Sequence, residues 1–303
     1  MNVQENEAEI SALQNKLLDL PIGSEEFEST RAELDALMRK TYTDLSAWDR
    51  VCIARSKRRI TAKALINKLF DEFIELKGDR YYADDESIIA GLAFLKGMPV
   101  TVIAQAKGAD TGESIRRNFG MTSPEGYRKA LRLAKQAEKF RRPIITVVDT
   151  SGAYPGKGAE ERGQARAIAE NLMEFSRLKT PITAIVLSEG GSGGALALTV
   201  SDYIYMFGNA VYSVLSPEGL SSILFKNTLN MKDICEQMKL TAADLKEKHI
   251  VDEIIDEPLG GITSIDDDFA AMLADKLSAK LKELSALDVD TLVARRYEKF
   301  RQI

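Results

Sequence analysis

Cysteine and histidine are scarce in this 303-residue chain, which holds two cysteines and one histidine. Cys52 and Cys235 lie far apart and belong to no Cys-x-x-Cys or Cys/His cluster. This pattern argues against a zinc site and against a disulfide framework, so we expect no metal in this chain. A Ser-His-Asp triad would have to use the lone histidine, His249.

Long apolar runs are absent as well, and no segment approaches the length that spans a membrane. The first ten residues, MNVQENEAEI, are acidic and polar, unlike a signal peptide. The net charge of -5 argues against nucleic acid as the main partner. With 45% hydrophobic and 29% charged residues, the composition is that of an ordinary globular protein. We therefore expect a cytoplasmic protein that does not bind membranes.

Glycine is concentrated in one stretch, where four of the five residues from Gly190 to Gly194 are glycines. The apolar run 182–187 before it predicts a buried strand, and Ala-Leu-Ala-Leu after it predicts a helix. Such a turn leaves backbone N–H groups without intrahelical partners and can form an oxyanion hole. The alternative is a turn that only lets the helix pack tightly on the sheet. The local pattern leaves both interpretations open.

The same stretch fits G-x-S-x-G in one register, with Ser192 in the nucleophile position. A serine nucleophile would need His249, which follows the charged residues Lys246-Glu247-Lys248 at an expected helix end. We therefore interpret the match as accidental.

Strands that alternate with helices between residues 86 and 256 predict an α/β core with largely parallel strands. Residues 88–95 and 100–106 read as a β-hairpin, whereas residues 61–76 read as one helix. The loops 150–158 and 189–194 follow predicted strands, and sites in such folds lie at the carboxyl ends of strands. We also expect two helices before residue 40, a helix over 160–177, a strand over 250–255 and helices from 266 onward.

Three longer motifs follow one another in the sequence: Val148-Asp149-Thr150-Ser151-Gly152-Ala153-Tyr154-Pro155-Gly156, Ser188-Glu189-Gly190-Gly191-Ser192-Gly193-Gly194-Ala195-Leu196-Ala197 and Tyr212-Ser213-Val214-Leu215-Ser216-Pro217-Glu218-Gly219. Together they closely resemble the alpha subunit of bacterial acetyl-CoA carboxylase carboxyltransferase. The resemblance also includes Arg116-Arg117-Asn118-Phe119-Gly120-Met121, Glu257-Pro258-Leu259-Gly260-Gly261 and Arg295-Arg296-Tyr297. It extends over essentially the whole chain.

The resemblance implies an α/β crotonase-like (ClpP/crotonase) spiral fold with an N-terminal helical extension and C-terminal helices. We place the helical extension at 1–60, the carboxyltransferase core at 61–265 and the C-terminal helices at 266–303. The implied assembly is an α2β2 heterotetramer with a beta subunit that carries a zinc ribbon. It works with the biotin carboxyl carrier protein and with biotin carboxylase.

The implied reaction moves a carboxyl group from carboxybiotin, on the separate carrier protein, to acetyl-CoA and forms malonyl-CoA for fatty-acid biosynthesis. By their match to the motif, Gly193 and Gly194 are the catalytic residues, whose N–H groups stabilise the charge on the ureido oxygen of biotin. The biotin nitrogen would then act as the base. The enolate of acetyl-CoA would be held by the beta subunit. The residues expected to shape the biotin pocket are Gly152, Ala153, Tyr154, Pro155, Gly190 and Gly191.

Two other functions stay open at this point. A stand-alone crotonase-fold hydratase, isomerase or thioester hydrolase would need a carboxylate over its substrate, for which Glu189 and Glu218 are candidates. An RNA-binding protein would use the basic segment 128–142, although aromatic residues are not interleaved there. The segments 55–59 and 128–142 could meet the phosphates of CoA or an acidic carrier, or form solvated faces.

Replacing His249 with alanine should leave enzymatic activity within a few-fold of the wild-type value, because the expected mechanism takes no proton through this residue. Steady-state kinetics of the purified variant would measure this. A loss of about 10²-fold or more, typical of a lost general base, would show that the chemistry is different.

Overall fold

The computed structural model describes residues 3–225 and 230–302, and its centre is one mixed β-sheet. The strands are β1 (Asp71–Glu75), β2 (Ile88–Leu95), β3 (Met98–Gln105), β4 (Ile144–Thr150), β5 (Ile182–Gly191), β6 (Tyr203–Phe207), β7 (Val211–Ser213) and β8 (Glu253–Ile255). Their order in the sheet is β1-β2-β3-β4-β5-β6-β8, and β7 pairs with the end of β5.

The sheet has an antiparallel part and a parallel part. β2 and β3 form the predicted hairpin, joined by Lys96 and Gly97, both with positive φ. From β3 to β8 the neighbouring strands are parallel, as predicted for an α/β core. β4 is buried along its whole length and β5 up to Gly190, which agrees with their continuous apolar sequences because parallel sheets are covered on both faces.

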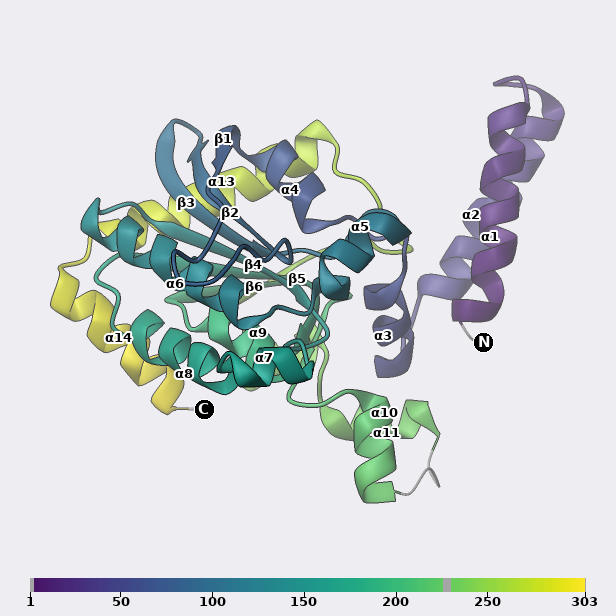
Figure 1. Ribbon diagram of the computed structural model, residues 1–303. Helices are drawn as coiled ribbons and strands as arrows, with labels where there is room; N and C mark the ends of the chain where they lie inside the picture. Colours follow the sequence, from purple (N-terminus) through teal and green to yellow (C-terminus); the bar gives the residue numbers. More distant parts are fainter. Residues whose placement is uncertain (1–2, 226–229, 303) are drawn as a thin grey trace.

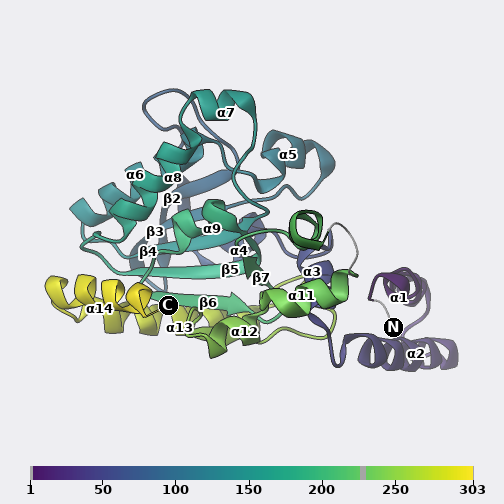
Figure 2. The ribbon, with the colours of Figure 1, turned by 90° about the horizontal axis from the view of Figure 1, so that it is seen from below.

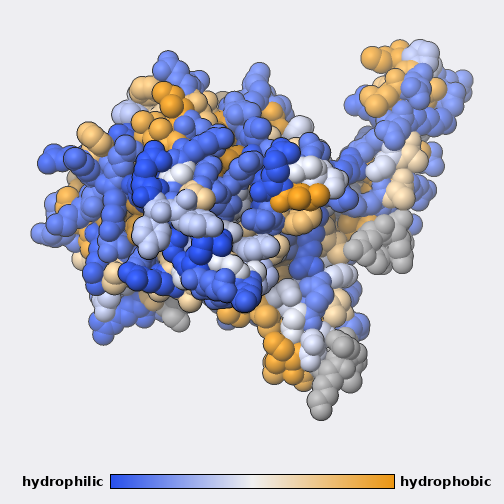
Figure 3. Space-filling view, viewed as in Figure 1, coloured by the Kyte–Doolittle hydropathy of each residue, from blue (hydrophilic) through white to orange (hydrophobic). Residues whose placement is uncertain are grey.

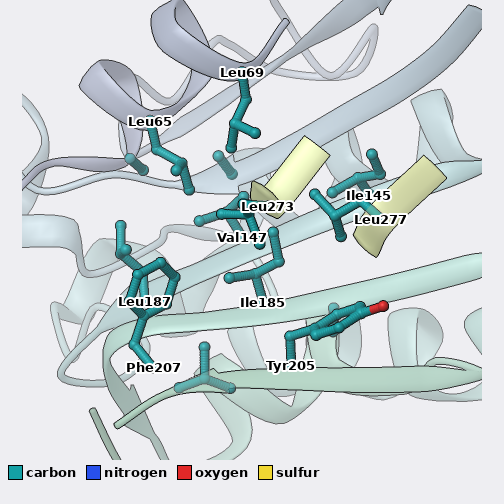
Figure 4. Packing of buried hydrophobic residues seen from close by; sticks show 14 of the residues in the cluster. Leu65, Leu69, Ile145, Val147, Ile185, Leu187, Tyr205, Phe207, Leu273 and Leu277 are labelled. Carbon is teal, nitrogen blue, oxygen red and sulfur yellow. The ribbon is translucent and has the colours of Figure 1, made fainter. Parts of the chain in front are cut away.

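Helices cover both faces of the sheet (Figures 1 and 2). One face carries α6 (Pro124–Lys139), α8 (Gln164–Phe175) and α9 (Ser192–Thr199), and the other carries α4 (Ala62–Leu69), α12 (Ala242–Glu247) and α13 (Asp267–Ser285). Figure 4 shows the second interface, where leucines of α4 and α13 pack on Ile145, Val147 and Ile185 of the sheet. Within the described residues, no helix is both long enough and apolar enough to cross a bilayer.

The first two helices form the predicted hairpin, which stands away from the sheet in Figure 1. They are α1 (Val3–Asp19) and α2 (Glu25–Tyr42), and the hydroxyl of Ser24 caps α2 by accepting from the N–H of Phe27. The hairpin meets α3 (Ala47–Arg55) through a small apolar cluster that includes Ile10 and Ile53. The division of the chain into a helical extension, a core and C-terminal helices at residues 60 and 265 stays a prediction.

Three predicted elements differ from the structure. The helix predicted over 61–76 ends at Leu69, and Asp71–Glu75 is the edge strand β1, because this segment pairs with β2. The helix predicted over 160–177 is divided by Gly163, whose φ of 82° interrupts the helical backbone. The strand predicted over 250–255 is shorter, Glu253–Ile255. The other short elements are α5 (Thr111–Arg116), a 3-10 turn (Asn118–Gly120), α7 (Lys157–Glu161), α10 (Pro217–Leu220), a π-helical turn (Ser221–Phe225) and α11 (Met231–Met238).

The last helix, α14 (Val289–Arg301), is anchored by the buried side chain of Arg296. Its guanidinium donates to both carboxylate oxygens of Asp202, from Nε at 2.8 Å and from Nη2 at 2.7 Å. The remaining donors reach the carbonyls of Phe175, Leu178 and Thr180. Part of the motif Arg295-Arg296-Tyr297 is therefore explained by a structural role, since Arg296 joins α14 to the segment between α8 and β5.

Replacing Arg296 with methionine should lower the free energy of unfolding by about 3–5 kcal/mol, because Asp202 would stay buried without its cation. Urea unfolding of the full-length chain would measure this. Arg295→Met is the matched control: its side chain is exposed, and the expected change is within about 0.5 kcal/mol. Equal effects of the two substitutions would contradict the proposed anchor.

Candidate active site

The two glycine-containing loops pack directly against each other at the carboxyl ends of β4 and β5. Thr150 and Gly190 are paired across the two strands. A Cβ atom added to Gly191 would lie 2.1 Å from the carbonyl oxygen of Ser151, and one added to Gly194 would lie 2.6 Å from the nitrogen of Ala153. These distances leave no room for a side chain. The loops predicted to shape one site therefore do lie together.

Gly193 differs from its neighbours because its position is open. A Cβ atom added there would meet only Cγ2 of Ile168, at an ordinary 3.7 Å. Packing therefore requires glycine at 191 and 194 and does not require it at 193. Both interpretations of the glycine stretch thus have support. The tight packing at Gly194 agrees with a turn that lets the helix pack on the sheet, and the open position of Gly193 agrees with an oxyanion hole.

The turn between β5 and α9 leaves the start of the helix without a side-chain cap. β5 ends at Gly191, Ser192 has a φ of 54°, and α9 begins there without a side-chain cap. The first N–H groups of a helix have no intrahelical acceptor, and the helix dipole adds partial positive charge. This arrangement can stabilise a negatively charged oxygen through backbone groups alone.

Two buried glutamines hold this arrangement in place. The Nε2 of Gln105, at the end of β3, donates to the carbonyl of Gly194 at 2.8 Å. The Nε2 of Gln164, at the start of α8, donates to the carbonyls of Thr122 and Tyr154 at 2.8 and 3.0 Å. Sequence reasoning missed both residues, because a single glutamine outside a motif carries no recognisable signal.

An apolar cavity of about 710 Å³ opens beside the turn and reaches Ser192 and Gly193. It adjoins a second cavity of about 220 Å³ that reaches Ser151, Gly190 and Gly191. Tyr154 and Pro155 line neither cavity, and the Tyr154 ring instead packs beside Gly156. Their contact with biotin stays a prediction. The apolar side chains that line the larger cavity are Leu196, Ile204, Tyr212, Val214, Leu215, Leu220, Met238, Leu245, Ile250 and Phe300.

The protein surface near this cavity is also apolar. Val214 is 82% exposed, Ile223 67% and Leu224 64%. Figure 3 shows hydrophobic surface at the lower end of the molecule, where Figure 1 places α10 and α11. A surface of this kind marks an interaction site.

The carboxylate of Glu189, just before the glycines, is buried between two cations. Its Oε1 lies 2.7 Å from Nε of Arg55, and its Oε2 lies 2.5 Å from Nζ of Lys107, which also contacts Asp149 at 3.1 Å. Burial by itself would raise the pKa of Glu189, but Lys107 and Arg55 outweigh burial and hold this pKa below its usual value. Likewise, Arg55 outweighs burial at Glu218 and lowers its pKa. Both carboxylates stay ionised and paired, which makes them poor general bases.

The serine of the G-x-S-x-G match has no catalytic histidine. Ser192 is exposed at the turn, and His249 is exposed in the turn after α12 with a φ of 59°. Among the described residues no hydrogen bond joins the two, and His249 does not line the cavity that Ser192 reaches. The same described part of the chain holds no group of three His, Cys, Asp or Glu side chains arranged to bind a metal. The absence of metal stays a prediction.

The basic segments 55–59 and 128–142 are largely occupied by internal contacts. Arg59 is buried and pairs with Glu257 at 2.6 Å, while it also donates to the carbonyl of Leu187. Lys129 is fully buried and donates to Asp84 at 2.6 Å. The interpretation of these segments as solvated faces is therefore wrong for Arg59 and Lys129, because their charges are paired inside the protein.

Solved structures with the same arrangement confirm the crotonase-like α/β fold. The transcarboxylase 12S hexamer core aligns with a TM-score of 0.59 at 21% identity, over 77% of this chain and 44% of that one. A Pseudomonas malonate decarboxylase hetero-tetramer in complex with coenzyme A aligns at 0.57 and 14% identity, over 69% of this chain and 84% of that one. The class defined by fold and site is a crotonase-like α/β protein with a backbone glycine turn.

Sequence comparison identifies the family within this class. Residues 1–303 match the family described as acetyl co-enzyme A carboxylase carboxyltransferase-like, and the chain belongs to this family. A relative from Halalkalibacterium halodurans, named acetyl-coenzyme A carboxylase carboxyl transferase subunit alpha, is 52% identical over 96% of this chain and 88% of its own length. A relative with the same name from Oceanobacillus iheyensis is 48% identical over 100% of this chain and 95% of its own length.

Replacing Gly194 with alanine should lower the free energy of unfolding by about 1–3 kcal/mol, because the new Cβ must displace the backbone at Gly152 and Ala153. Gly193→Ala is the matched control and should leave stability unchanged or raise it by up to about 1 kcal/mol, since alanine favours helix. Chemical denaturation of both variants would test this. Equal destabilisation at the two positions would contradict the described packing.

Proposed function

We propose that this chain is the carboxyltransferase alpha subunit of acetyl-CoA carboxylase. In this function it transfers the carboxyl group of carboxybiotin to acetyl-CoA and forms malonyl-CoA, the first committed step of fatty-acid biosynthesis. The observation that carries the proposal is the open backbone of the glycine turn beside an apolar cavity, in a chain about half identical to relatives of that name. A cytoplasmic location fits this function.

The proposed role of the glycine turn is to stabilise negative charge with backbone N–H groups. Carboxybiotin contributes a transferable carboxyl group and, once this has left, a basic ring nitrogen. The N–H groups of Gly193 and Gly194 donate hydrogen bonds to the oxygen on which negative charge develops. The open space beside Gly193 and the apolar lining of the cavity fit a small bicyclic ring with one carbonyl oxygen.

The remaining glycines set the geometry of this pocket. Gly190 and Gly191 line the smaller cavity, and Gly152 and Ala153 support the first turn of α9 through close backbone contact. We keep Tyr154 and Pro155 as proposed pocket residues on the strength of the motif.

Partners complete the site. The paired state of Glu189 and Glu218 leaves neither of these two candidates ready to remove a proton from acetyl-CoA, which agrees with a base supplied by biotin. The exposed apolar surface around Val214 and Leu224 fits the docking of another subunit. We assign the enolate-binding half of the site and the zinc ribbon to a beta subunit in an α2β2 complex. Biotin carboxylase and the biotin carboxyl carrier protein would supply this complex with carboxybiotin.

The direct test is reconstitution with a beta subunit and biotinylated carrier, followed by malonyl-CoA formation. The chain alone should be inactive and the complex active. Gly193→Pro should reduce the rate of the complex by about 10²–10³-fold, since it removes one backbone donor, while Gly193→Ala keeps the donor and most activity. Proline lacks only an N–H that the first turn of a helix does not use, but it also disfavours the backbone of Ser192, whose φ is 54°, so circular dichroism must verify that the variant is folded.

Ser192→Ala distinguishes the alternative enzyme class. A backbone oxyanion hole should tolerate this change within a few-fold. Loss of activity in folded Ser192→Ala together with full activity in folded Gly193→Pro would favour a serine hydrolase and overturn the proposal.

A further inference from the structure

Arg55, the last residue of α3, connects three elements around the glycine turn. Its Nε lies 2.7 Å from Oε1 of Glu189 on β5, and its Nη1 lies 2.6 Å from Oε1 of Glu218 on α10. Its Nη2 also reaches the second oxygen of Glu218, at 3.4 Å. One guanidinium thus bridges two carboxylates from different parts of the chain, a task for which the rigid fork of arginine is suited.

Glu189 transmits this contact to the glycines. The residue is paired with Val211 of β7, and Gly190 and Gly191 follow it in the same strand. Lys107 holds its other carboxylate oxygen from the opposite side. The two cations therefore fix the end of β5, and with it the position at which α9 begins.

Glu218 connects Arg55 to the wall of the cavity. It lies in α10, which follows the exposed residue Val214 and the cavity residue Leu215. Arg55 itself lines the 220 Å³ cavity beside the glycines and a separate cavity of about 570 Å³ on its other side. It stands where the two cavities adjoin.

We propose that Arg55 is a positioning residue for the carboxyl transfer described above, and this inference rests on that proposed function. Its hydrogen bonds to two carboxylates set the distance between the glycine turn and α10, so that the backbone donors face the apolar cavity. It acts through Glu189 and Glu218 and does not contact the reacting atoms.

The charges around Glu189 predict a pH effect with a definite sign. The groups that face it are Arg55 from α3, Lys107 from the end of β3 and, through these cations, Asp149 from β4 and Glu218 from α10. The pKa of Glu189 is held low, so its ionised form, which binds Arg55 and Lys107, persists until the pH falls through this lowered pKa. Without Arg55 the pKa of Glu189 rises. As the pH is lowered, the variant should therefore lose activity at a higher pH than the wild type does.

The experiment compares Arg55→Gln and Arg55→Lys in the reconstituted complex with beta subunit and carrier. We expect Arg55→Gln to lower kcat about 10- to 100-fold, since a small misplacement of donors has effects of this size, with KM for acetyl-CoA changed less than about two-fold. The acid limb of its pH profile should move upward. Arg55→Lys should recover part of kcat, because it retains one ionic contact to Glu189.

Arg166→Gln is the matched control, since this arginine also pairs with a carboxylate, Glu170, but its side chain is 82% exposed on α8. It should leave kcat and the pH profile unchanged. A wild-type complex without activity would refute the proposed function and not the role of Arg55 in particular. The inference would be overturned if Arg55→Gln left kcat unchanged or raised only KM. It would also be overturned if the variant lost activity only in proportion to its unfolded fraction and kept the wild-type pH profile.

Discussion

Close backbone contact between the two glycine loops is the constraint on which the site depends. Gly191 and Gly194 lie so near Ser151, Gly152 and Ala153 that no Cβ atom fits between them. This contact joins the ends of β4 and β5 and places the first turn of α9 against the loop after β4. Gly193 is free of this constraint and lines the apolar cavity. One packing requirement thus fixes the turn and leaves Gly193 beside the cavity, as the proposed role of its N–H group requires.

Ion pairs and hydrogen bonds around the end of β5 agree with the proposal that backbone groups carry the chemistry. Arg59 binds the carbonyl of Leu187, and Arg55 and Lys107 share the carboxylate of Glu189. Arg55 and Lys107 keep the carboxylate of Glu189 charged and engaged, so these side chains fix the strand and do not transfer protons. Fixed backbone dipoles beside the paired carboxylates of Glu189 and Glu218 suit the proposed reaction, in which a cofactor supplies the base.

Most of the sheet and the position of the two glycine loops at the strand ends could be predicted from the sequence, because apolar runs and glycine turns are local signals. The end of α4 and the strand β1 could not, since Asp71–Glu75 becomes a strand only by pairing with β2. Gln105 and Gln164 were missed because their role depends on contacts far along the chain. Likewise, the basic residues Arg59 and Lys129 resemble a solvated surface in sequence, and only their buried carboxylate partners reveal a structural role.

The most direct test of this account is an experimental structure of the complex with a beta subunit and biotin bound. The account predicts the ureido oxygen of biotin within about 2.7–3.1 Å of the backbone nitrogen of Gly193 or Gly194, with the ring in the apolar cavity. A ureido oxygen that instead contacts the side chain of Ser192 or Glu189, with both backbone N–H groups directed elsewhere, would contradict it.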